Sequence, residues 1–374
     1  MATSPSGGAV AARPSTTAPA PSGRPPFSKR LMSALAFDKI GAVYVWIAII
    51  IVFSIWVPDT FPTIDTAKQI LNSNAITGLA ALAITIPLAA RVFDLSFAYT
   101  MTLTGVAVAK FVIGGMPLGL ALLLGVGIGL GIGLINAVVV VVAKIDSFIG
   151  TLATGSLILA LITMITNDTP ISDASLTGGF SDIGQTDIGG ITLPVFYFAL
   201  AALAIWYLLE HTATGRRLYA TGFNPDASRL AGVRVDKLRF LSLVTCGTIA
   251  GATGIVLAST LGSGSPTAGT PYLLPAFAAV FLGATQLKNG RFNAGGTIIA
   301  VLLLGTGTTG LALAAAPTWS QSMFVGIVLI AALAVTGIQR RTAVASRGSG
   351  VHAGGSAGTE QSGVGVATSL TDED

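Results

Sequence analysis

About ten long apolar runs, separated by short polar breaks, occupy most of this 374-residue chain. A membrane-spanning helix needs about 20 consecutive apolar residues, with a range near 17–25. The runs at 75–90 and 272–286 are short, as expected of half-helices or re-entrant segments lined by protein. The full set is 41–57, 75–90, 96–115, 117–142, 148–165, 191–209, 240–262, 272–286, 293–314 and 319–338. The sequence therefore predicts an all-α polytopic membrane protein with about ten transmembrane segments.

The composition excludes most soluble enzymes and most metal sites. Hydrophobic residues make up 52% and charged residues 10% of the chain, whereas soluble domains carry roughly 25% charged residues. The single cysteine, Cys246, excludes an intrachain disulfide, and two histidines leave almost nothing for a histidine-based metal site. No Gly-Lys pair occurs, so the chain has no phosphate-binding loop of the G-x-x-x-x-G-K-[ST] type. We therefore expect no cofactor, no bound metal and no ATPase activity of its own.

Composition and charge divide the chain into three regions. Residues 1–40 and 342–374 are rich in small and polar residues and are predicted to be disordered cytoplasmic tails around a transmembrane domain at 41–341. With both ends inside, the cytoplasmic segments hold all of the 20 Lys and Arg residues except Lys68 and Lys110, as the positive-inside rule requires. The positive-inside rule therefore accounts for the net positive charge of the chain, which would otherwise suggest a nucleic-acid partner. We expect no nucleic-acid partner.

The longest basic segment, residues 210–239, is the most informative of the inner loops. Asn224 and Pro225 form a helix-start signal, because Asn caps helices and Pro suits the first turn. A short amphipathic helix is expected over 226–231, and Gly232 can end it. Such a helix, lying along the membrane and facing the cytosol, is suited to docking a partner protein. A basic loop that only sets the topology explains the charge equally well.

A few polar residues in or near the apolar runs are candidates for a solute pathway, because polar groups within a bilayer are costly and often functional. Asp94 stands at a predicted break beside Ser96, where capping of the next helix is favoured over contact with substrate. Asn136 and Thr151 lie near the ends of their runs. Either residue could line a pathway, although a hydrogen bond between helices is the more common role.

Glycines in the run 117–142 form two interleaved series, each with a spacing of four. The first series is Gly125, Gly129 and Gly133, and the second is Gly127 and Gly131. Small residues at this spacing let another helix approach closely. We predict that both series pack against helices and have no direct role with substrate.

The basic loop and three further segments resemble the permeases of bacterial ABC importers, in the ribose, xylose and galactose branch of the branched-chain-permease type. The loop matches from Thr214 to Asn224 and again at Ala227, Arg229, Gly232 and Val233, where that family reads roughly T-x-x-G-R-x-x-Y-A-x-G-x-N-x-x-A-A-x-x-x-G-I. Residues 94–96, 147–152 and 276–295 resemble further segments of the same family, in the same order. The resemblance covers about residues 40–340. One departure is Arg91, which stands where the family has the first Gly of G-G-x-D-L-S.

The resemblance implies a permease subunit that moves a simple sugar or polyol by alternating access, driven by a separate ABC ATPase. It implies that a coupling element docks on the ATPase, formed here by Gly215, Arg216, Asn224, Ala227, Arg229 and Gly232. It also implies a second permease copy or a paralogue, and an extracytoplasmic substrate-binding protein. An ion-coupled secondary transporter of a small solute is the main alternative, for which Asp94 is the one buried acidic candidate. An exporter of the same family type and an intramembrane enzyme are further alternatives.

Overall fold

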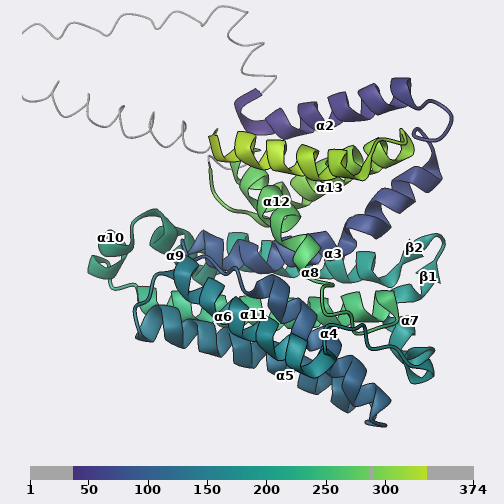
Figure 1. Ribbon diagram of the computed structural model, residues 1–374. Coiled ribbons are helices and arrows are strands. Elements are labelled where there is room, and N and C mark those ends of the chain that lie inside the picture. The colour runs from purple at the N-terminus through teal and green to yellow at the C-terminus, as the bar shows by residue number, and fades with distance from the viewer. Residues whose placement is uncertain (1–36, 287–289, 335–374) are drawn as a thin grey trace, which may run out of the picture. The chain divides into compact units, whose positions relative to one another are not determined.

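Helices dominate the computed structural model, which describes residues 37–286 and 290–334 (Figure 1). The long helices are α2 (Phe37–Trp56), α3 (Ile64–Ala89), α4 (Phe97–Ile113), α5 (Leu118–Ala137), α6 (Ser147–Thr166), α8 (Leu193–His211), α11 (Val235–Leu261), α12 (Leu273–Gln286), α13 (Ala294–Leu313) and a last helix over Thr318–Ala334. The shorter elements are η1 (Val138–Val142), η2 (Ala174–Leu176), α7 (Gly179–Gln185), α9 (Ala213–Phe223), α10 (Pro225–Leu230) and η3 (Thr270–Tyr272). The predicted tails lie outside the described residues, except for 37–40.

In the described part of the chain, each predicted apolar run corresponds to a helix to within a few residues at either end, and the all-α polytopic class is confirmed. Among the described residues, six helices are long and apolar enough to cross a membrane, and four further apolar helices are shorter. The expected half-helix at 75–90 is wrong, because the helix begins earlier, at Ile64. Thr63 caps its first turn by accepting a hydrogen bond from the Thr66 amide at 3.1 Å, and the polar residues that follow are helical. The short helix predicted at 272–286 is confirmed as α12, which has 14 residues.

The core is built around α11, which packs against α3, α4 and α5, while α3 also packs against α8, α12 and α13. The α5–α11 contact is made by glycines. A Cβ on Gly129 would lie 2.6 Å from the carbonyl oxygen of Gly247 and 2.8 Å from Cα of Gly251. The first predicted glycine series therefore packs as expected. The second does not pack within the described chain, because a Cβ on Gly127 or Gly131 would have no atom within 4 Å.

The only described strands form a small hairpin between α7 and α8. Strands β1 (Asp187–Ile188) and β2 (Ile191–Thr192) pair antiparallel, with Asp187 opposite Thr192. Both residues of the turn, Gly189 and Gly190, have positive φ values of 67° and 89°, which a two-residue hairpin turn of this hand requires. The side chain of Asn72 on α3 holds the hairpin by donating to the Gly190 carbonyl at 3.0 Å.

Candidate functional site

The predicted coupling element begins at a sharp corner between α8 and α9. Thr212 ends α8 and caps α9, because its Oγ1 accepts a hydrogen bond from the Gly215 amide at 3.1 Å. Gly215 is buried, and a Cβ there would overlap the carbonyl oxygens of Leu208 and Leu209. Only glycine therefore permits this corner. Arg216, the next residue, is exposed.

Helix α9 is fixed to the ends of two other helices. A Cβ on Gly222 would overlap the carbonyl oxygen of Ala89, so the backbone of α9 lies directly against the end of α3. The Tyr219 hydroxyl donates to the carbonyl of Phe292 at 3.0 Å, just before α13, and the Arg291 guanidinium lies 5.5 Å from the centre of the tyrosine ring. Burial, and then the negative charge of Glu210, raise the pKa of Tyr219, so the hydroxyl remains a donor.

Helix α10 has the start and the end that the sequence predicts. Asn224 Oδ1 accepts hydrogen bonds from the amides of Asp226 at 3.1 Å and Ala227 at 3.0 Å. Gly232 has a φ of 79°, and its amide donates to the Arg229 carbonyl at 2.9 Å. The amide of Val233 donates to the Ser228 carbonyl at 2.9 Å, which completes a Schellman motif. These local bonds hold a six-residue helix that is too short to be stable by itself.

The side chains of α10 tie it to α11 and leave an apolar tip exposed. Arg229 pairs with Asp226 at 3.2 Å and with Asp236, on the first turn of α11, at 3.0 Å. Hydrogen bonding and charge attraction from Asp236 raise the pKa of Arg229. Leu230 is 92% exposed. Leu230 lies in the predicted short helix but is not among the predicted coupling residues, although a leucine at the end of a short helix in a basic loop is a usable signal.

The four predicted pathway residues come together in one buried network, reached from the α3–α4 break, α5 and α6. Asp94 Oδ1 accepts hydrogen bonds from the Ser96 amide at 2.9 Å and the Ser96 hydroxyl at 2.7 Å. The Asn136 amide donates to Ser96 Oγ at 2.7 Å and to Asp94 Oδ1 at 3.4 Å. Thr151 Oγ1 accepts from the Leu95 amide at 3.0 Å. All four predicted side chains are at most 1% exposed.

This network fixes the extended segment before α4, which includes Leu95. Asp94 accepts from the amide of Ser96, which precedes α4, and the Ser96 side chain makes no capping bond to the helix. The expected capping role of Asp94 is therefore indirect. A direct role for these residues in the solute pathway stays a prediction.

The fixed segment forms one wall of an apolar cavity of about 710 Å³. Its lining comes from α3, the 91–95 segment, α6, α12 and the last helix, and consists of Leu88, Arg91, Phe93, Leu95, Phe148, Leu273, Leu274, Phe277, Phe281, Phe292, Leu329 and Leu333. The ring centres of Phe93 and Phe281 lie 6.5 Å apart, and those of Phe281 and Phe292 lie 5.5 Å apart. Cavities of about 300–1,000 Å³ with mainly apolar walls are typical small-molecule sites.

Arg91 lines this cavity in a left-handed backbone conformation, with a φ of 56°. Only glycine adopts this conformation without a steric cost, which is about 1 kcal/mol for other residues. We expect Arg91→Gly to raise the thermal unfolding midpoint of the detergent-solubilised protein, and Arg91→Ala, which removes the same side chain but keeps the backbone cost, not to raise it. Equal midpoints for the two variants would contradict the assignment of strain to this φ.

Comparison with known proteins places these features among transport permeases. The profile of one family, described as branched-chain amino acid transport system / permease component, matches residues 66–333. The chain is 34% identical to the ribose import permease protein RbsC of Bacillus subtilis, over 82% of this chain and 94% of that protein. It is 33% identical to RbsC of Escherichia coli K12, over 84% and 97%, and 29% identical to the D-allose transport system permease protein AlsC of that strain, over 81% and 92%. No solved structure matches the chain.

Proposed function

Because this chain belongs to the family of permease components of branched-chain amino acid transport systems, we propose that it is the membrane-spanning subunit of an ABC importer for a simple sugar or polyol. The family makes it a multi-pass protein of the cytoplasmic membrane and a permease rather than an enzyme. The names of its relatives, which include ribose import and D-allose transport permeases, support a sugar as the substrate.

The observation that carries the proposal is the capped, exposed helix α10. A short helix with an exposed leucine suits a groove on a partner protein, and the basic surroundings of α10 support a cytoplasmic location. The contacts of α10 and α9 lead inward, through Asp236 to α11 and through Gly222 to the end of α3. Movement of an ATPase subunit that holds α10 would therefore act on the two helices at the centre of the packing.

The substrate is proposed to pass beside the aromatic cavity and the Asp94 network. A second permease copy, or a paralogue, would complete the pathway, and a substrate-binding protein would deliver the sugar to the outer loops, which include 166–190. ATP binding and hydrolysis would drive alternating access, because the ATPase pair and its ligands favour one permease state over the other. Asp94, held by Ser96 and Asn136, has a structural role in this scheme and carries no coupling ion.

Reconstitution separates this proposal from the ion-coupled alternative. We expect proteoliposomes that contain the permease, its ATPase subunit and its binding protein to accumulate labelled D-ribose or D-allose only when ATP reaches the ATPase. A protonophore and a sodium ionophore should leave the rate unchanged. Uptake by the permease alone, or uptake abolished by collapse of an ion gradient, would establish the alternative. Net release from preloaded vesicles would indicate an exporter.

A further inference from the structure

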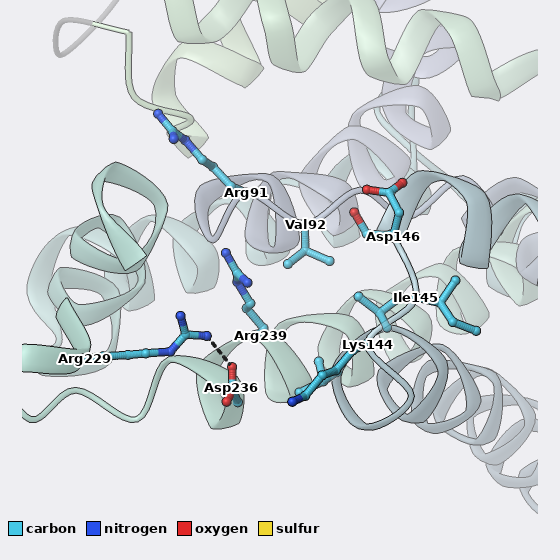
Figure 2. A pocket seen from close by; sticks show the side chains of 11 residues that line it. Arg91, Val92, Lys144, Ile145, Asp146, Arg229, Asp236 and Arg239 are labelled. Atoms are coloured by element: carbon cyan, nitrogen blue, oxygen red, sulfur yellow. Dashed lines mark hydrogen bonds and ion pairs between the residues drawn. The ribbon is translucent and has the colours of Figure 1, made fainter. Parts of the chain in front are cut away.

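A second, polar cavity of about 690 Å³ lies beside α10 and is separate from the aromatic cavity, with only Arg91 lining both (Figure 2). It is bounded by the end of α3, the η1–α6 connection, α10 and the first turns of α11. Its charged lining residues are Arg91, Lys144, Arg229 and Arg239, with Asp146 and Asp236. Basic groups therefore outnumber acidic groups in this cavity by two.

Both carboxylates already have partners within the protein. Asp236 pairs with Arg229 at 3.0 Å. Asp146 Oδ1 accepts hydrogen bonds from the amides of Phe148 at 3.0 Å and Ile149 at 3.3 Å, and thereby caps α6. Arg91, Lys144 and Arg239, by contrast, form no ion pair with any residue in the described part of the chain. The positive charge of the cavity is therefore not neutralised by its own lining.

The protein keeps these basic groups together at a cost. Arg91 and Lys144 both have a φ of 56°, a conformation that non-glycine residues rarely adopt and that tends to persist where function requires it. The Nε of Arg239 is buried without a hydrogen-bond partner among the described residues. Figure 2 shows Arg239 between Arg91 and the Arg229–Asp236 pair. Converging, unneutralised guanidinium groups are suited to a phosphate.

We propose that this cavity binds the phosphate group of an anionic phospholipid. The cavity lies at the ends of membrane helices that the charge distribution places at the cytoplasmic surface, where anionic lipids reside. Its lining includes Ile145, which is 44% exposed, and two apolar residues close to Ile145 in the sequence, Val142 and Ile149, are 65% and 64% exposed. An acyl chain can lie along this surface while its phosphate reaches the arginines. A soluble anion would use only the polar half of the site.

The lipid would also contact the coupling element, and this consequence rests on the proposed function. Arg229 and Asp236 line the cavity and form the ion pair that joins α10 to α11. A phosphate beside Arg229 competes with Asp236 for the guanidinium, and so for the ion pair that joins α10 to α11. Anionic lipid is therefore expected to change the rate of ATP-driven uptake through α10, without entering the solute pathway.

The test measures binding of phosphatidylglycerol to the full chain in detergent by native mass spectrometry. The affinity for one bound phosphatidylglycerol should fall about five-fold in Lys144→Gln or in Arg239→Gln, and about 25-fold in the double variant. The reason is that each basic residue contributes about 1 kcal/mol toward binding of an anionic lipid. Arg217→Gln is the matched control, because Arg217 is exposed on neighbouring α9 and does not line the cavity. Phosphatidylcholine, which carries no net charge, should not compete, and millimolar inorganic phosphate should not displace the lipid. A monodisperse elution profile establishes that each variant is folded.

Three outcomes would overturn the proposal. The first is equal affinity of wild type and the double variant, or an equal loss in Arg217→Gln. The second is displacement of the lipid by inorganic phosphate, which would identify a soluble-anion site. The third is lipid binding only after Asp372, Glu373 and Asp374 are neutralised, which would make the acidic end of the chain the occupant. Co-purification of the ATPase is measured in parallel. A variant that loses lipid but retains the ATPase leaves the proposed coupling intact, whereas retained lipid without ATPase binding contradicts only the coupling.

Discussion

Replacing Leu230 by aspartate is expected to abolish ATP-driven uptake while the permease stays folded and in the membrane. Leu230 is 92% exposed at the end of α10, so the free energy of unfolding should change by no more than about 0.5 kcal/mol. In a groove of the ATPase the same side chain would be a central apolar anchor. Truncation of such an anchor costs about 2 kcal/mol or more, and a buried unpaired carboxylate costs more. We expect ATPase binding to weaken at least about 30-fold.

Co-purification of the ATPase with a tagged permease measures this effect, and the uptake assay reports its consequence. Ile188→Asp is the matched control, because Ile188 is also a large exposed apolar residue, at 56%, but lies in the β1–β2 hairpin. It should retain the ATPase fully. Normal co-purification and uptake with Leu230→Asp would remove α10 from the coupling role, whatever the substrate.

The second large effect is expected at the glycine contact between α5 and α11. A Cβ on Gly129 would already press against the backbone of Gly247 and Gly251, which cannot move aside as a flexible side chain can. Gly129→Leu should therefore force the two central helices apart and destabilise the fold by more than about 3 kcal/mol. We expect little or no monodisperse protein after detergent extraction, as measured by size-exclusion chromatography.

Gly127→Leu, two residues earlier on the same helix, is the matched control. A Cβ on Gly127 would have no described atom within 4 Å, and leucine favours a helix over glycine by about 0.8 kcal/mol. This variant should elute normally, with an unfolding midpoint equal to or above that of wild type. Equal losses for both variants would mean that leucine is harmful anywhere on α5 and that the contact with α11 is not the cause.

Local features of the fold could be predicted from the sequence, because local signals determine them. The apolar runs predict the helices, and Asn224 with Gly232 predicts both ends of α10, since capping needs only neighbouring residues. The start of α3 was missed because residues 64–74 are polar enough to resemble a loop. Their helix is determined by the Thr63 cap and by packing, for example the bond from Asn72 to the β1–β2 hairpin.

The site was predictable as a set of residues but not as a geometry. Asp94, Ser96, Asn136 and Thr151 could be chosen as polar residues of apolar runs, yet only the folded chain joins them in one network. The polar cavity was not predicted at all. Its basic residues are far apart in the sequence. The positive-inside rule already accounts for each of them as a residue of an inner loop. The left-handed backbone at Arg91 and Lys144 leaves no pattern that hydropathy can reveal.

The glycine contact between α5 and α11 also limits how the molecule can change shape. Two backbones that touch without intervening side chains have no rotamers to exchange, so we expect these helices to travel as one rigid body through a transport cycle. Relative motion then has to occur where adaptable side chains separate the helices. We expect the boundary of α12 with the 91–95 segment to be one such place, because the rings of Phe93, Phe277 and Phe281 pack there.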